Sequence, residues 1–380
     1  MNYRMGRLGF FAHPALAKES PEEVRGNYGY LDQLAALKWV HKNIAAFGGD
    51  PDKITIAGES AGGGSVLTML TSPMSRGLFR AAILESPGIP SPREGVLPLT
   101  SLADAESIAT QYATSLGISG TDSHALAKLR AVPAATLVEG ATAPAEISYL
   151  SGGPAIPGIS GAILDGRLET QSPDRTLLSA RQAPVPVLIG SNDADLGVGR
   201  QKTGTTTKDA LFAVFGPFAS RARAIYDPKG TGKLATLRDE VFADRTMTEP
   251  ELYLADAVTR SGHPVYVYRF SYVPQAMRAT VAGVAHALEI PFVFDIPEAL
   301  TKDKTTDADR KMAAVTSAYW VSFVKTGDPN GSGRVEWPVH QAGSFNLLNF
   351  TNEGVVSERD PFEPRIQLWQ TMWKARVAKP

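Results

Sequence analysis

The sequence contains no cysteine among its 380 residues, which excludes disulfide bonds, thiolate chemistry and cysteine-ligated metal sites. Its charges nearly cancel, with 38 lysine and arginine residues, 39 aspartate and glutamate residues and a net charge of −1. No basic excess therefore favours nucleic acid or an anionic membrane surface as a partner. No apolar run approaches the length of a membrane span, and the opening residues do not form a secretory signal. The compartment and the oligomeric state stay open.

The residues that are present predict an α/β protein. Hydrophobic residues make up 43% of the chain, enough for one large domain or two smaller ones. An amphipathic pattern predicts a helix from Tyr30 to Phe47, closed by two glycines, and the segment ITIAG predicts a strand directly after it. Residues 91–183 read as a helical excursion with few strand signals. Further strands are expected in FRAAILESPG, PVPVLIG, HPVYVYRFSYV and SFNLLNF, and further helices in DADRKMAAVTSAYWVSFVKTG and RIQLWQTMWKARV.

The first motif of interest is GESAG, in which Ser60 lies between Gly58 and Gly62. With 35 glycines in the chain the pattern alone is weak, but here a helix and a strand precede it and a helix follows. A sharp strand-to-helix turn would expose the serine hydroxyl, and a side chain at either glycine would then clash with neighbouring backbone. Ser60 is therefore a candidate nucleophile, with a helix cap as the alternative.

A serine nucleophile needs a base and an acid that orients the base. The position of His286, in a loop beyond the last long strand, favours it over His41 on a helix and His263 at the beginning of a strand. Asp193 and Asp195 follow the strand VPVLIG and are both candidate acids, although aspartate is also common in ordinary turns. The order serine, aspartate, histidine is that of α/β-hydrolases.

Several segments of the chain resemble the type B carboxylesterase family, which includes bacterial p-nitrobenzyl esterases and cholinesterases. They are NYRMGRLGFFAHPAL, GNYGYLDQLAALKWVHKNIAAFGGDPDKITIAGESAGGGSV, HALEIPFVF and FVKTGDPNG with WP after it. The resemblance covers most of the chain and is faint over 91–183. It implies an α/β-hydrolase fold, with a mostly parallel sheet, helices on both faces and a single catalytic domain over 1–380 in which the excursion contributes to the pocket.

The resemblance also implies roles for individual residues. Ser60 matches the family's nucleophile and His286 its base, while the residue after the nucleophile, Ala61, matches a backbone donor to the oxyanion. Glu59 matches an acid beside the nucleophile and Ser86 a serine near the triad, where structural hydrogen bonding is an equally good interpretation. Two other charged residues, Arg4 and Glu289, match positions that simple ion pairs would explain.

The sequence departs from the family pattern in two places. The family's acid is usually a glutamate in a DEG-like setting, whereas GSNDADLG places Asp195 there and leaves Asp193 as a rival. The family's HGGG-type oxyanion loop precedes the NYR segment, and the sequence begins just before that segment. We therefore expect the domain to lack its first strands and that loop.

The resulting hypothesis is hydrolysis of a small carboxylic ester through a serine acyl-enzyme, a reaction that needs no cofactor and no metal. The alternative is a catalytically impaired fragment or a non-catalytic binding relative of the same fold. Acyl transfer or amide cleavage would use the same residues, so the sequence does not separate them from ester hydrolysis. The acyl and alcohol groups of the substrate are not defined either.

Overall fold

The computed structural model describes residues 1–87, 99–141, 156–159, 161–196 and 205–377. Contacts between residues divide the chain into two compact units, each built from three segments. The N-terminal unit comprises Met1–Ile54, Gly64–Phe79 and Gly88–Ala183, and the sheet unit comprises Thr55–Gly63, Arg80–Pro87 and Pro184–Pro380. The expected single domain, with an excursion that contributes to the pocket, stays a prediction.

A six-stranded sheet forms the centre of the sheet unit, in the order β1-β2-β5-β6-β7-β8. Its first five strands are parallel, and β8 is antiparallel to β7. The carboxyl ends of the parallel strands therefore lie at one edge, where loops collect functional side chains. The strands are β1 Thr55–Glu59, β2 Ala81–Glu85, β5 Val187–Asn192, β6 Val265–Phe270, β7 Asn346–Thr351 and β8 Gly354–Arg359.

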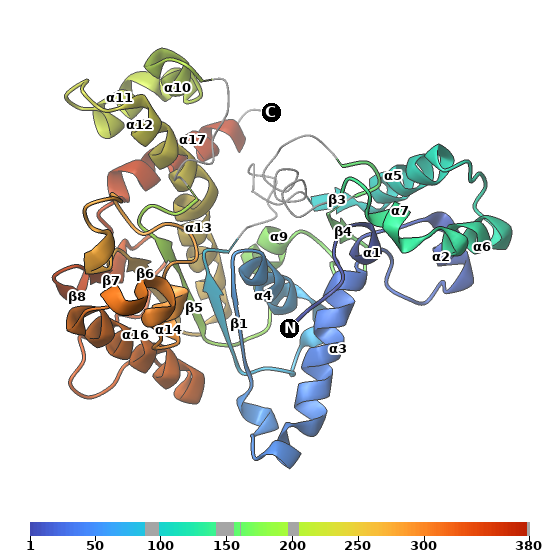
Figure 1. Ribbon diagram of the computed structural model, residues 1–380, viewed down its shortest axis with the longest axis horizontal. Helices are drawn as coiled ribbons and strands as arrows, with labels where there is room; N and C mark the ends of the chain where they lie inside the picture. The colour runs from blue at the N-terminus through green and yellow to red at the C-terminus, as the bar shows by residue number, and fades with distance from the viewer. Residues whose placement is uncertain (88–98, 142–155, 160, 197–204, 378–380) are drawn as a thin grey trace. The chain divides into compact units, whose positions relative to one another are not determined.

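Both faces of this sheet are covered by helices of the same unit (Figure 1). Alternation along β6 directs Tyr268 toward Trp320 of α16 (Asp307–Thr326), with ring centroids 5.1 Å apart. Its neighbour Arg269 points to the opposite face, where it pairs with Glu251 of α13 (Glu249–Val258) at 3.3 Å. Helices on both faces and a largely parallel sheet agree with the fold expected from the sequence.

The remaining helices of the sheet unit complete its core. A second apolar cluster joins Phe212, Phe215 and Trp369, and the terminal helix α17 supplies the tryptophan. A π-helical turn, Asp244–Thr248, links α12 to α13. The other helices are α10 Lys208–Ala213, α11 Ala219–Tyr226, α12 Leu234–Ala243, α14 Ile290–Val293, α15 Glu298–Thr301 and α17 Glu363–Val377.

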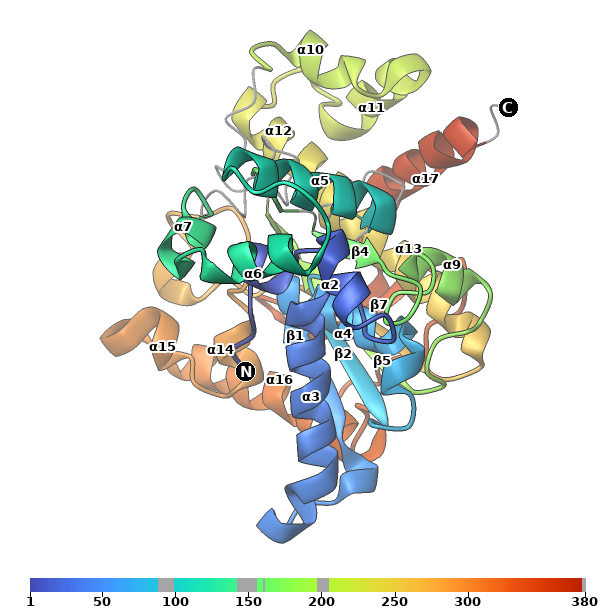
Figure 2. The ribbon, with the colours of Figure 1, turned by 90° about the vertical axis from the view of Figure 1, so that its right-hand side faces the viewer.

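The N-terminal unit is mostly helical. Its long helix α3 begins at Tyr28 and ends at Asn43, and a 3₁₀ turn extends it to Phe47, where Gly48 takes a left-handed conformation (φ 81°). Figure 2 shows α2 beside α6, in agreement with the contacts between these two helices. The remaining elements are α1 Gly6–Gly9, α2 Pro14–Glu19, α5 Leu102–Ser115, α6 Ser123–Ala131, α7 Ala134–Val138, α9 Pro173–Leu178, β3 Leu99–Ser101 and β4 Ala162–Leu164.

Candidate active site

The corner at Ser60 turns the chain directly from a strand into a helix. Strand β1 ends at Glu59 and helix α4 (Ala61–Thr71) begins at Ala61, so one residue makes the whole connection. Ser60 has a positive φ of 56°, which is unfavourable for a residue with a side chain. Its backbone N–H donates to the Glu85 carbonyl at 2.9 Å, which ties the corner to the end of β2.

The glycines around Ser60 differ from each other in their surroundings. A Cβ at Gly58 would lie 2.3 Å from the carbonyl carbon of Gly62, so this position requires glycine. Among the described residues, a Cβ at Gly62 would meet nothing within 4 Å. Our prediction of a clash at Gly62 is therefore wrong. The other crowded position is Gly63, where a Cβ would lie 2.9 Å from the Cα atom of Pro87.

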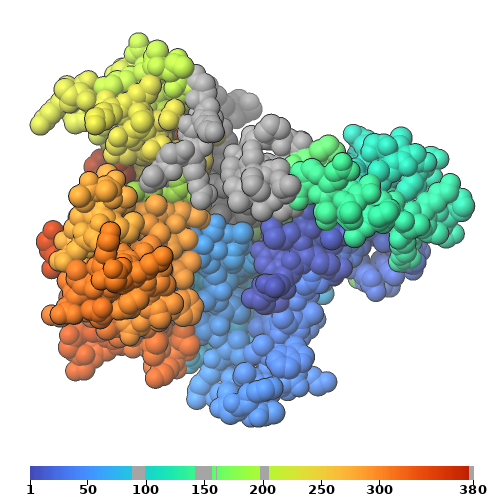
Figure 3. All heavy atoms as spheres, viewed as in Figure 1, coloured from blue at the N-terminus to red at the C-terminus, as the bar shows by residue number. Residues whose placement is uncertain are grey.

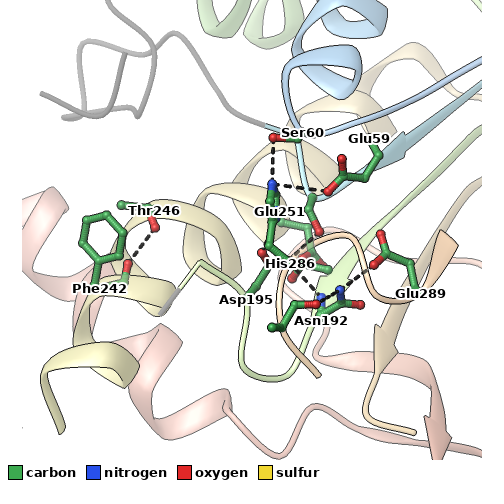
Figure 4. A network of polar contacts seen from close by, with 12 residues as sticks. Glu59, Ser60, Asn192, Asp195, Phe242, Thr246, Glu251, His286 and Glu289 are labelled. Atoms are coloured by element: carbon green, nitrogen blue, oxygen red, sulfur yellow. Dashed lines mark hydrogen bonds and ion pairs between the residues drawn. The ribbon is translucent and has the colours of Figure 1, made fainter. Parts of the chain in front are cut away.

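His286 contacts the serine hydroxyl from the loop that follows β6. Its Nε2 atom lies 2.7 Å from Ser60 Oγ, and Figure 4 shows the two side chains pointing toward one another. The next residue, Ala287, has a φ of 68°, so the loop turns sharply just after the histidine. Of the six histidines, all in described parts of the chain, only His286 contacts Ser60.

Asp195 completes a continuous line of hydrogen bonds. Its Oδ1 atom lies 2.5 Å from His286 Nδ1. The other oxygen, Oδ2, accepts the Ser86 hydroxyl at 2.5 Å and the Asn192 backbone N–H at 3.1 Å. The side chain is fully buried, with 0% of its surface exposed, so these partners fix its position. The structure thus brings together Ser60, His286 and Asp195, and it places Ser86 behind the aspartate.

Asp193 has a different partner on the same loop. Its Oδ1 atom accepts the Val284 backbone N–H at 2.6 Å, while the Ala194 N–H donates to the Val284 carbonyl at 3.1 Å. Burial raises the pKa of the Asp193 carboxyl to about 6. Asp193 therefore holds the backbone two residues before His286, whereas Asp195 contacts the imidazole itself.

Three further carboxyls surround this line. Glu59 Oε1 lies 3.3 Å from His286 Nε2. Glu85 accepts the indole N–H of Trp320 at 2.5 Å, and burial raises the pKa of its carboxyl to about 7. Burial also raises the pKa of Glu289 well above its usual value. Glu85 and Glu289 are therefore less ionised at neutral pH than ordinary glutamates, and they add less negative charge to the site.

Asn192, which no motif of the sequence singles out, links three parts of the site. Its amide nitrogen donates to the Ala285 carbonyl at 2.9 Å and to the Glu289 carboxyl at 2.5 Å (Figure 4). Glu289 thus has an amide partner, and no ion pair joins it to another described residue. Arg4 does form the expected kind of ion pair, with Asp32 at 2.7 Å. The one signal available for Asn192 was its place two residues after the predicted strand PVPVLIG.

Ala61 occupies the position expected of a backbone donor, as the first residue of α4 directly after Ser60. No cluster of potential metal ligands occurs among the described residues. Within the same residues, no helix combines the length and apolar character needed to cross a bilayer.

The site therefore consists of the Ser60 hydroxyl, the His286 imidazole in contact with it, and the buried Asp195 carboxyl that orients the imidazole. This arrangement is suited to nucleophilic catalysis.

A sequence model described as "Carboxylesterase family" matches residues 1–212 and 221–369 of the chain. The match includes Ser60, Asp195 and His286, the three residues that the structure brings together. It covers parts of both compact units, and so the similarity extends over nearly the whole chain.

Curated relatives are similar over most of the chain. Fumonisin B1 esterase of Sphingopyxis macrogoltabida is 35% identical over 350 residues, which cover 89% of this chain and 60% of that protein. Acylcarnitine hydrolase of Mus musculus is 33% identical, with the same two coverages of 89% and 60%. Para-nitrobenzyl esterase of Bacillus subtilis (strain 168) is 30% identical and covers 95% of this chain and 70% of its own length. The chain thus spans 60% of the length of the first two relatives.

The solved structures give a consistent result. A structure of PNB esterase matches with a TM-score of 0.76 and 28% identity, covering 97% of this chain and 73% of the esterase chain. A second structure of PNB esterase gives a TM-score of 0.75 and 29% identity, with coverages of 97% and 72%.

Proposed function

Because the chain belongs to the carboxylesterase family, we propose that it hydrolyses carboxylic esters through an acyl-enzyme formed on Ser60. The similarity to PNB esterase and the order of the strands identify the α/β-hydrolase fold, which confirms the fold class predicted from the sequence. The observation that carries the proposal is the line of hydrogen bonds from Ser60 through His286 to Asp195.

In the proposed acylation, His286 Nε2 takes the proton of Ser60 while the serine oxygen attacks the ester carbonyl carbon. The resulting tetrahedral intermediate loses its alcohol, which leaves with the proton from Nε2. A water molecule then gives a proton to Nε2 and attacks the acyl carbon, and the carboxylic acid leaves as Ser60 recovers its proton. The 2.7 Å contact between Ser60 Oγ and Nε2 suits both proton transfers.

Two carboxyls support the proposal, because each lies near enough to stabilise the imidazolium that would form during each step. Asp195 accepts a hydrogen bond from the Nδ1–H of His286, with 2.5 Å between Oδ1 and Nδ1, and thereby selects the tautomer whose Nε2 faces the serine. Glu59 lies 3.3 Å from Nε2, where a carboxylate would attract the imidazolium but not the neutral ring. Ala61, at the beginning of α4, is our proposed backbone donor to the oxyanion.

The proposed substrate is a small carboxylic ester. The three relatives are named for different compounds, namely fumonisin B1, acylcarnitine and para-nitrobenzyl esters. Specificity in such enzymes depends on pocket walls, which differ between members of one fold. We therefore propose the reaction class and not one of these three substrates.

The proposal is tested by reaction with a fluorophosphonate, which forms a stable adduct with an activated serine. We expect mass spectrometry to find the adduct on the peptide containing Ser60, and we expect Ser60→Ala to abolish labelling. Ser344, a serine outside the site in the same unit, provides the matched control, and Ser344→Ala should label like the parent. An adduct on Ser86 with Ser60 unmodified would overturn the assignment of the nucleophile.

A further inference from the structure

The N-terminal unit contains a cavity of about 410 Å³, which is within the range of small-molecule sites. All of its lining residues belong to this unit, and none of them belongs to the Ser60 site. Its walls include the aliphatic side chains of Leu16, Val24, Leu126 and Leu129. Figure 3 shows the N-terminal segment, in dark blue, against the green segment that includes α7, and contacts between α1 and α7 confirm that they are neighbours.

One cation in the cavity lining has an unusual environment. Arg7 is only 7% exposed, and its guanidinium makes four hydrogen bonds, all to backbone carbonyls. These acceptors are Pro157, Leu137 and Glu139. A guanidinium has five N–H groups, so one N–H, on Nη2, has no acceptor among the described residues. Carbonyls carry no net charge, and among the described residues no carboxylate forms an ion pair with Arg7.

The other arginines of the lining have carboxylate partners. Arg130 binds Glu19 through both of its terminal nitrogens at 2.6 Å, and Arg25 lies 3.7 Å from Glu106. Arg4 pairs with Asp32 as described above. Arg7 is therefore the buried cation of this lining that has no carboxylate partner among the described residues. Four carbonyl hydrogen bonds and the face of the Tyr112 ring, whose centroid lies 4.3 Å from the guanidinium carbon, stabilise it, and a ligand anion would neutralise its net charge.

His13 adds a hydrogen-bond donor to the same cavity lining. Its Nδ1 atom accepts the Ala15 backbone N–H at 3.3 Å, so the neutral ring carries its proton on Nε2. Burial lowers the pKa of His13, which favours this neutral form. The residue is 1% exposed, and among the described residues Nε2 has no hydrogen-bond partner. An unsatisfied donor at this depth calls for an acceptor from a ligand.

We propose that this cavity binds a small organic monocarboxylate with an apolar body. The carboxylate offers the negative charge that Arg7 lacks and an acceptor for the Nε2 proton of His13. The apolar body fits against the leucine and valine side chains of the wall. This binding site goes beyond ester hydrolysis and does not depend on Ser60.

The first test measures binding by calorimetry in the Ser60→Ala background, with 4-phenylbutyrate as the probe and its neutral amide as the comparison. We expect one carboxylate per chain and an amide affinity at least about tenfold weaker, because the amide loses the charge-assisted contact. Inorganic phosphate should compete poorly, since it lacks the apolar body. Equal affinity for the carboxylate and the amide would contradict the role of Arg7. Failure of the carboxylate to bind at about 10 mM would overturn the site.

The second test uses variants of the N-terminal unit in the same background. His13→Ser keeps an N-cap oxygen for the Ala15 N–H but removes the Nε2 donor, and it should weaken the carboxylate about tenfold or more. Ala17→Trp fills the cavity with a bulky side chain and should abolish binding. His124→Ala changes an exposed histidine outside the lining and serves as the matched control. Unchanged affinity in Ala17→Trp, with native circular dichroism, would show that the probe binds elsewhere.

Discussion

Asp193 and Asp195 are two residues apart, yet their carboxyls act on different atoms of the loop that carries His286. Asp195 contacts the imidazole, and Asp193 accepts a backbone N–H at Val284. The division follows from the turn that begins at Asp193, directly after β5, since a turn does not keep the side chains of residues two apart on one face as an extended strand would. The charge of Asp195 therefore bears on the proton transfers of the proposed mechanism, while Asp193 bears on the position of the loop.

This difference predicts unequal effects of two conservative substitutions on ester hydrolysis. Asp195→Asn should lower kcat on the order of ten-thousandfold, the loss seen in a template serine triad, because the amide favours the wrong tautomer of His286. Asp193→Asn retains an oxygen that can accept the Val284 N–H, and it should cost at most about tenfold. Steady-state kinetics with p-nitrophenyl butyrate measures both. A larger loss in Asp193→Asn would reverse our choice of the acid.

At the residue scale, the sequence pointed to Ser60 and His286, which the structure brings into contact, but not to their surroundings. Ser60 lies in a motif with fixed spacing, and His286 has a favourable place in chain order. Asn192 carries no such signal, because its importance comes from two contacts with residues more than ninety positions away, Ala285 and Glu289. Contacts of this kind depend on side-chain direction, which a single sequence does not specify.

The strand-to-helix corner shows a similar limit at the element scale. Its location was predictable from the apolar strand and the glycines, but the close approach within it was not. Gly58 approaches the backbone of Gly62, whereas none of the described residues lies in the Cβ direction of Gly62 itself. Strand β8 was also missed, because only Asn352 and Glu353 separate it from β7. This connection also lacks the Asn-Gly or Asp-Gly pair by which a tight hairpin turn is recognised in a sequence.

The two glycines of the corner make a matched pair for experiment. Gly58→Ala places a methyl group 2.3 Å from backbone atoms, so we expect several kcal/mol of destabilisation or loss of soluble protein. Gly62→Ala should be tolerated, and alanine in place of glycine within α4 should stabilise the helix by about 0.5–1 kcal/mol. Urea unfolding of both variants measures the difference. Equal destabilisation by the two substitutions would contradict this account of the corner.

At the scale of the whole molecule, carboxyls that are buried without a cation link folding to pH. Glu85 in the sheet unit and Glu169 in the N-terminal unit are 6% and 2% exposed. Burial raises their pKa values to about 7 and about 8, from an ordinary value of 4.5. Composition gave no sign of this feature, because a net charge of −1 does not reveal which acids are buried. Each compact unit therefore contains its own pH-sensitive group.

The sign of this linkage predicts lower stability toward higher pH. The folded state binds the Glu169 proton more tightly than the unfolded chain does. The stability that this proton contributes is complete below about pH 4.5 and is lost as the pH rises through about 8. Glu169→Gln removes the titration, so between about pH 5 and pH 7 the parent should lose about 2 kcal/mol of unfolding free energy relative to the variant. Urea unfolding at several pH values measures this difference in unfolding free energy.

Glu139→Gln changes an exposed residue of the same unit and serves as the control, so its pH dependence should follow that of the parent. Parallel curves for Glu169→Gln and the parent would show that Glu169 does not control the pH dependence of folding.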